Sequence, residues 1–258
     1  MALAASYPQG TPMLAADVFA GQVAVITEAN DPIGQAIAAE LSRGGAKVVP
    51  LEVDVRDAAA VKRAFDAIEA ANGPISILVN HFANRADAPV EVMSVEAWQD
   101  ITHRVLDGTF NTCRELGLRR IADGRPATVV NGGTPYDITG GAGRAAAVAA
   151  GAGVMNLTKS LAVEWAPYDI RVNGIAPGYV AGSEAGPVSE GDLAVTVPGG
   201  RLCEPHEVAW FVAYMCCPFA AYLTGHTFVL DGASWQRPGR SPPLFEPIRD
   251  RYDAALKG

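Results

Sequence analysis

The sequence predicts a single α/β domain built on a doubly wound parallel sheet. Short, almost continuously apolar runs alternate with longer segments whose apolar residues recur at helical spacing. Uninterrupted apolar runs are typical of strands buried on both faces of a parallel sheet. The chain of 258 residues is 49% hydrophobic and 19% charged, a composition that suits one globular unit of this size. Repeated β-α-β units imply right-handed crossovers with helices on both faces.

The alternation can be followed along the chain from Gly21 onward. Strands are predicted at residues 22–27, 46–55, 75–79, 127–130, 170–175 and 227–230. Helices are predicted at residues 33–43, 58–72, 95–118, 145–165 and 205–215. The first helix stops at Gly44-Gly45, a common end signal. We expect an N-terminal arm over residues 1–20, the sheet domain over 21–236 and a C-terminal tail over 237–258.

Composition and charge exclude several classes of function. The formal net charge of -8 argues against a nucleic-acid partner, because no basic stripe is present to displace counterions. No apolar run reaches the ~18 residues of a membrane span, and no leader peptide opens the chain. The four cysteines form no C-x-x-C pair, so we expect reduced thiols and no metal site. The sequence predicts a cytoplasmic protein that binds neither membrane nor nucleic acid.

Four segments carry a family resemblance. They are Asp54-Val55, Asn80-His81-Phe82-Ala83, the stretch LAVEWAPYDIRVNGIAPG at 161–178 and the stretch LTGHTFVLDG at 223–232. In order and spacing they resemble the short-chain dehydrogenase/reductase family over roughly residues 20–235. Residues 162–182 look most like its dienoyl-CoA-reductase branch. The resemblance implies a Rossmann-type fold, but function has to be argued site by site.

The phosphate-binding loop departs from the family pattern. The resemblance implies Thr-Gly-x-x-x-Gly-x-Gly, whose glycines let backbone N–H groups approach a pyrophosphate at a helix N-terminus. Here Glu28 and Pro32 replace two glycines after Thr27, and Gly34 is retained. Pro32 lacks an N–H, and Glu28 and Asp31 place carboxylates near the phosphates. We therefore expect no nucleotide cofactor in this chain, with NAD(H) held by a partner subunit.

The stretch of sequence that would form the adenosine-binding side of the implied cofactor site is also shortened. Asp54 follows Lys47 by seven positions, which leaves no room for the helix and strand that the family places there. The second and third strands are predicted to be fused, or one is deleted. Asp54, Asn80, Pro177 and Gly178 stand as remnants of a cofactor site.

The catalytic positions that the resemblance implies are also altered. The family uses a Ser, a Tyr and a Lys, with Tyr and Lys four residues apart so that they share one helix face. These positions fall on Thr134, Ala147 and Gly151, and the family's Asn appears as Val105. Tyr136 lies in the loop after Thr134. The resemblance thus implies no catalytic residue here, and a loss of the acid/base removes about 10² to 10⁴ in rate.

Two other polar residues lie near the predicted site. His81 stands at the carboxyl end of a strand, where ligands bind in such sheets, and either acts as a general base or is a hydrogen-bonded loop histidine. Asp137 is near Thr134 and is a candidate for the missing acid. The Gly/Ala-rich run at 140–153 favours close packing of helices in an oligomer.

These features lead to one main hypothesis and two alternatives. The main hypothesis is a catalytically inactive subunit that pairs with and supports an active NAD-dependent dehydrogenase of the hydroxyacyl-CoA type. It resembles the degenerate chain of the two-subunit hydroxyacyl-CoA dehydrogenase of benzylsuccinate degradation, with homo-oligomer against heterotetramer left open. The first alternative is a nucleotide-free enzyme on the same scaffold, similar to halohydrin dehalogenases and resting on Thr134, His81 or Asp137. The second alternative is a divergent but active NAD(P)-dependent oxidoreductase.

Overall fold

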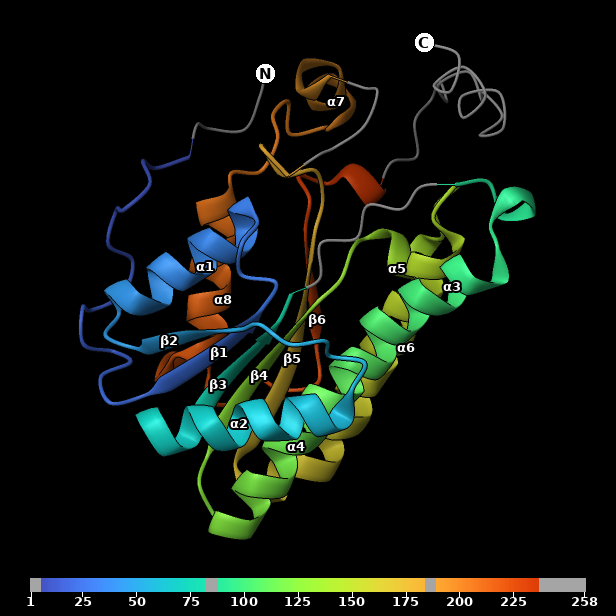
Figure 1. The fold of residues 1–258 in the computed structure, drawn as a ribbon. Helices are drawn as coiled ribbons and strands as arrows, with labels where there is room; N and C mark the ends of the chain where they lie inside the picture. Colours follow the sequence, from blue (N-terminus) through green and yellow to red (C-terminus); the bar gives the residue numbers. More distant parts are fainter. Residues whose placement is uncertain (1–5, 82–87, 184–188, 237–258) are drawn as a thin grey trace.

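The computed structural model describes residues 6–81, 88–183 and 189–236. Its centre is a sheet of six parallel strands in the order β2-β1-β3-β4-β5-β6, with helices on both faces (Figure 1). The strands are β1 (Val23–Thr27), β2 (Lys47–Leu51), β3 (Ile75–Asn80), β4 (Ala127–Gly132), β5 (Ile170–Pro177) and β6 (Thr227–Leu230). This topology confirms the predicted doubly wound parallel sheet.

Strand β2 is shorter than the predicted strand at 46–55. It ends at Leu51, and the chain turns before α2 (Ala58–Asn72) begins. Pro50 lies within β2, which is the outermost strand beside β1. An edge strand tolerates proline because one row of its N–H groups has no partner strand. A single strand therefore stands between α1 and α2, as the shortened region predicts.

The helices form two layers. One face of the sheet carries α1 (Pro32–Arg43) and α8 (Pro205–Cys216), and the other carries α2, α4 (Gly108–Asp123) and α6 (Ala145–Trp165) (Figure 1). The predicted helix at 95–118 is longer than expected: α3 (Val95–Thr102) runs through a π-helical turn at His103–Asp107 into α4. Two short helices, α5 (Tyr136–Thr139) and α7 (Glu190–Thr196), have no counterpart in the prediction, since a single turn has no measurable periodicity.

Apolar side chains fill the space between the sheet and each helical layer. Ile26 and Ile37 are buried on the side of α1 and α8, and Phe65 and Leu116 are buried on the side of α2 and α4. The segment before β1 contributes Phe19, which is 1% exposed. Burial of this kind is the main stabilising term of the fold.

A buried polar network ties the sheet to two helices beneath the candidate site. Asn80 donates from Nδ2 to Asn131 Oδ1 at 2.9 Å, and Thr112 Oγ1 donates to Asn80 Oδ1 at 2.7 Å. Asn131 Nδ2 donates to Thr158 Oγ1 at 2.9 Å. These side chains are nearly inaccessible to solvent, so their amides depend on one another for hydrogen bonds. The network fixes the carboxyl ends of β3 and β4.

Thr158→Val is expected to lower the free energy of unfolding by about 1–3 kcal/mol, because it leaves the Asn131 amide without its acceptor at nearly unchanged volume. Denaturant unfolding measures the loss. Ser160→Ala is the matched control: Ser160 is exposed on the same helix and its hydroxyl bonds only to the Asn156 carbonyl. Equal stability of both variants would contradict the role given to the network.

Helix α6 is long and largely apolar. Together with the turn that follows it, at 145–168, it is long and apolar enough to cross a membrane by length and composition alone. In this fold it lies against the sheet and packs Leu161, Ala162 and Trp165 into the core. These three residues belong to the buried face of the helix.

Candidate active site

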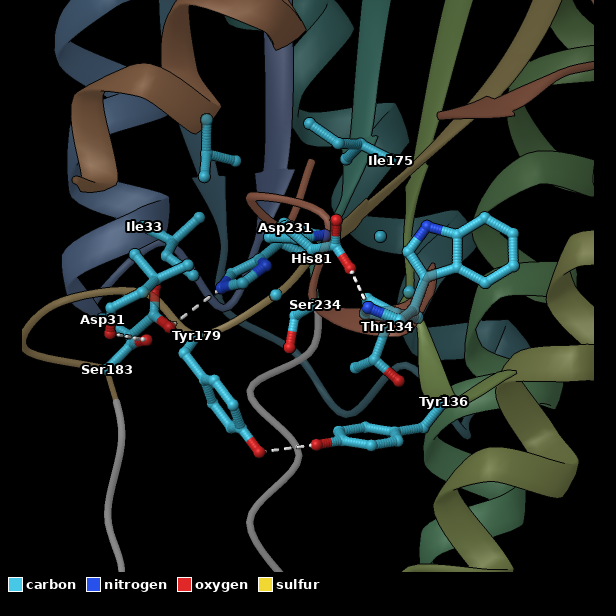
Figure 2. Close-up of a pocket in the computed structure, with 18 of the residues that line it drawn as sticks. Asp31, Ile33, His81, Thr134, Tyr136, Ile175, Tyr179, Ser183, Asp231 and Ser234 are labelled. Atoms are coloured by element: carbon cyan, nitrogen blue, oxygen red, sulfur yellow. Dashed lines mark hydrogen bonds and ion pairs between the residues drawn. The ribbon is translucent and has the colours of Figure 1, made fainter. Parts of the chain in front are cut away.

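A pocket opens at the carboxyl ends of the strands, where open α/β sheets bind ligands. It encloses about 200 Å³. Its apolar wall includes Ile33, Ile37, Val180 and Val208 from α1, the segment after β5 and α8. Polar side chains line the rest of it: Asp31, His81, Thr134, Tyr136, Arg144, Tyr179, Ser183, Asp231 and Ser234. Figure 2 shows these groups converging from loops that are far apart in the sequence.

In the altered phosphate loop, the Asp31 carboxylate lies at the N-terminus of helix α1. Asp31 is the N-cap residue, and its Oδ1 accepts the Gly34 N–H at 2.7 Å. The other oxygen of the carboxylate, Oδ2, lies 2.9 Å from His81 Nε2. A helix N-terminus with bare N–H groups is a phosphate site; here a carboxylate already takes one of those donors. Glu28 adopts a φ of 45°, in the left-handed region that a glycine would occupy without strain.

The retained glycine of this loop has a steric reason. A Cβ at position 34 would lie 2.7 Å from Ala29 Cα and 2.8 Å from the Glu28 carbonyl oxygen. The tight passage from strand to helix thus excludes any side chain there. That nucleotide binding is lost or weakened remains a prediction.

A second hollow lies where the sequence places the adenosine remnant. It is lined by Leu51, Val53, Val55 and a ring of charged residues. Asp54 accepts bonds from the Arg56 guanidinium at 2.8 Å and from the Arg56 N–H at 3.0 Å, and these bonds lower the pKa of Asp54. The hollow therefore combines apolar side chains with carboxylates that are paired with Arg56 and Arg104.

The other remnants of the implied cofactor site, Asn80, Pro177 and Gly178, line the pocket and are uncharged. Asn80 belongs to the buried network. It is the last residue of β3, and the next residue, His81, lines the pocket. Pro177 ends β5, and a Cβ on Gly178 would lie 2.6 Å from Asp231 Cβ. This close approach holds the loop after β5 against the loop after β6. It also directs Tyr179 into the pocket.

Two of the three implied catalytic positions, Thr134 and Gly151, lie against Asp137, a residue outside the family pattern. Thr134 lines the pocket, and its Oγ1 donates to Asp137 Oδ1 at 3.0 Å. The Asp137 carboxyl lies over Gly151: a Cβ at position 151 would be 2.3 Å from Asp137 Cγ. Ala147 is half-buried one turn earlier on α6. Where the family places an ammonium, this chain has a carboxyl group.

Two phenols that the sequence analysis did not assign also enter the pocket. The hydroxyl oxygens of Tyr136 and Tyr179 lie 2.7 Å apart, and Figure 2 shows the rings reaching toward each other from opposite sides. The Arg144 guanidinium stacks 5.3 Å from the centre of the Tyr136 ring. One feature of the sequence could have indicated that Tyr179 lies at the site: it directly follows the Pro177-Gly178 turn at the end of a predicted strand. Among the described residues no cluster of three or more His, Cys, Asp or Glu is arranged to hold a metal ion.

Comparison with known proteins places these residues in a family context. Residues 15–233 match a family model described as enoyl-(acyl carrier protein) reductase. A 3-oxoacyl-[acyl-carrier-protein] reductase of Vibrio cholerae is 31% identical over 83% of this chain and 98% of its own length. A probable 2,4-dienoyl-CoA reductase of Bacillus subtilis is 34% identical over 74% of this chain and 78% of its own. A crystal structure of a short chain dehydrogenase from Bacillus anthracis superposes with a TM-score of 0.80 at 29% identity, covering 87% of this chain and all of that one.

These relatives overturn the main functional hypothesis. The prediction of a catalytically inactive subunit serving a dehydrogenase partner is wrong, because the relatives that span the chain are named as reductases themselves. The error has a physical source. Inactivity was inferred from the altered loop, the shortened region before Asp54 and the altered catalytic positions, whereas a titratable group can reach the same pocket from another segment. Tyr136 and Tyr179 line the pocket from two such segments. The alternative of an active oxidoreductase agrees better with the relatives.

Proposed function

Since this chain belongs to the short-chain dehydrogenase/reductase family, we propose that it is an active nicotinamide-dependent oxidoreductase. Its reaction interconverts the carbonyl and hydroxyl forms of an acyl thioester. The reductases of acyl-carrier-protein and CoA thioesters among its relatives support this substrate class. So does the pocket, which has an apolar wall at α1 and α8 and hydroxyl groups opposite it.

The observation that carries the proposal is the pair of phenols on the pocket wall. Reduction of a carbonyl needs a proton donor at the oxygen, and position 147 offers only a methyl group. Tyr136 supplies the missing phenol from the loop after β4, with its hydroxyl 2.7 Å from that of Tyr179. A phenol held by a second phenol can pass a proton to substrate and regain one from its neighbour.

The remaining polar groups orient the substrate. In the reducing direction Tyr136 O–H gives its proton to the carbonyl oxygen as that oxygen becomes a hydroxyl, and Tyr179 restores the proton. Thr134 Oγ1, at the position of the family's serine, binds the same oxygen. The Arg144 guanidinium over the Tyr136 ring places positive charge beside the donor, which offsets the negative charge left when the proton departs.

A nicotinamide cofactor would extend from the second hollow, across the N-terminus of α1, to the pocket. Leu51 and Val53 beside Asp54 offer an apolar wall and a carboxylate for an adenosine. The loop after Pro177-Gly178 borders the space for a nicotinamide ring. A bound nicotinamide would supply the hydride to the carbonyl carbon. A diphosphate at the N-terminus of α1 would compete with the Asp31 carboxylate for the Gly34 N–H, so nucleotide binding would require that side chain to turn aside.

Turnover of a small thioester tests the proposal directly. Purified chain is mixed with NADPH or NADH and acetoacetyl-CoA, and consumption of the reduced nicotinamide is followed together with the 3-hydroxyacyl product. We expect turnover that requires the nucleotide. Free acetoacetate, which lacks the thioester, serves as the substrate control. Failure of the thioester to turn over, or product formed without nucleotide, would contradict the proposal.

A further inference from the structure

Two glycines from different elements leave a niche for one carboxyl group. Gly151 lies on α6, and a Cβ there would be 2.3 Å from Asp137 Cγ. Gly133 follows β4, and a Cβ there would be 2.7 Å from Asp137 Oδ2. Neither separation can be tolerated, so an alanine at either position would displace the carboxyl group. The niche explains why the lysine position of the family carries no side chain in this protein.

Within this niche the carboxyl group holds Thr134 by two bonds. Oδ2 accepts the Thr134 backbone N–H at 2.8 Å, and Oδ1 lies 3.0 Å from Thr134 Oγ1. Thr134 lines the pocket, with Asp137 behind it. Burial raises the pKa of Asp137 to about 6, although the bonds from Thr134 oppose that rise.

We propose that Asp137 is the positioning residue of the substrate site and that its protonation sets the direction of the Thr134 hydroxyl bond. The inference rests on the proposed function. An ionised Asp137 accepts the Thr134 O–H, so Oγ1 turns a lone pair to the pocket and receives a substrate hydroxyl. A protonated Asp137 donates to Oγ1, and the Thr134 O–H is released to bind a substrate carbonyl oxygen.

Few other groups near this carboxyl titrate. The part of α6 that faces it, residues 145–156, has no ionisable side chain, nor do the strand ends at 131–133 and 175–177. From its own loop and helix come the Tyr136 phenol and the Arg144 guanidinium, stacked on each other. The arginine stays charged at every pH of interest. His81, Asp31 and Asp231 line the same pocket as Thr134, and a Cβ on Gly132 would lie 3.8 Å from His81 Nδ1. Comparison of the wild type with Asp137→Asn therefore separates the effect of Asp137 on carbonyl binding near pH 6 from any effect of these three groups.

Asp137→Asn separates this role from a purely structural one. The Thr134 N–H requires an acceptor, so the amide oxygen faces it and the amide NH₂ donates to Oγ1, as in the protonated acid. In the wild type the KM for acetoacetyl-CoA is expected to rise about 5- to 10-fold as the pH increases through 6. Ionised Asp137 then takes the Thr134 O–H, so the substrate carbonyl loses one hydrogen bond. In Asp137→Asn the KM should stay at its low-pH value throughout. A variant that keeps the wild-type pH profile of KM would overturn the inference.

A double-mutant cycle on stability tests the geometry without any need for activity. Gly151→Ala should increase the unfolding equilibrium constant about 10-fold or more in the wild type, and much less in an Asp137→Ala background where the niche is empty. Gly153→Ala on the same helix meets only the Leu106 methyl at 3.0 Å and should be additive with Asp137→Ala.

The two experiments separate the two proposals. Additivity of Gly151→Ala with Asp137→Ala, in a chain that turns over substrate, would overturn the role of Asp137 alone. Strong coupling in a chain that never turns over substrate would overturn the proposed function and, with it, that role.

Discussion

Replacing Asp31 by serine is expected to tighten NAD(H) binding by about 10- to 100-fold. The Asp31 carboxylate accepts the Gly34 N–H at 2.7 Å, which puts its negative charge where a diphosphate would meet the N-terminus of α1. A repulsion between unit charges ~4 Å apart costs about 1–4 kcal/mol near a protein surface, and each 1.4 kcal/mol is tenfold in affinity. Serine still caps the helix, so the gain is not lost to unfolding. Calorimetric titration with NADH and NADPH measures the change.

Asp57→Ser is the matched control for this substitution. Asp57 caps α2 in the same way, accepting from the Ala59 and Ala60 N–H groups, but it lines neither the pocket nor the second hollow. Its loss should leave nucleotide affinity unchanged, whereas stability should respond similarly in both variants. If Asp31→Ser binds nucleotide no better than the wild type, then Pro32 and Glu28, rather than Asp31, limit binding.

Most of the framework was accessible from sequence because its signals are local. Helices α2 and α6 begin and end where predicted. Asp57 caps the start of α2 and Gly73 follows its end. The strands follow from apolar runs too short for helices. Predictions were poorer where a neighbour decides the outcome. Strand β2 ends at Leu51, opposite Thr27, the last residue of its partner strand β1, and the apolar run in the sequence does not reveal this limit.

The candidate site was predicted only in part, for a reason of the same kind. Thr134, which its spacing from the following helix assigned to the family's serine position, lines the pocket, and its role there stays a prediction. The meaning of Gly151 was not visible, because it depends on a carboxyl group fourteen positions earlier in the chain that folds back over it. Likewise Tyr136 and Tyr179 are 43 residues apart in sequence and touch through their hydroxyls. A residue-by-residue comparison with a family pattern detects which groups are missing but not which groups have replaced them.

Tyr136→Phe is expected to lower kcat for acetoacetyl-CoA reduction by about 10²-fold or more, because it deletes the proton donor while keeping the ring under Arg144. Tyr179→Phe should cost less, about 10-fold, since Tyr136 retains its own O–H and loses only the group that restores its proton. Initial rates of reduced-nicotinamide consumption measure both.

Tyr222→Phe provides the control, as the Tyr222 side chain is 103% exposed and should tolerate the change without effect on rate. The loss of kcat should be larger in Tyr136→Phe than in Tyr179→Phe. If the phenol pair acts as a relay, the member nearer the substrate must matter more, and deleting both must cost little beyond the loss of Tyr136 alone. A Tyr136→Phe variant at the wild-type rate would mean that the proton reaches the substrate from a group other than this pair. The pocket would then have to act through the Thr134 hydroxyl, and the loss should appear in Thr134→Val instead.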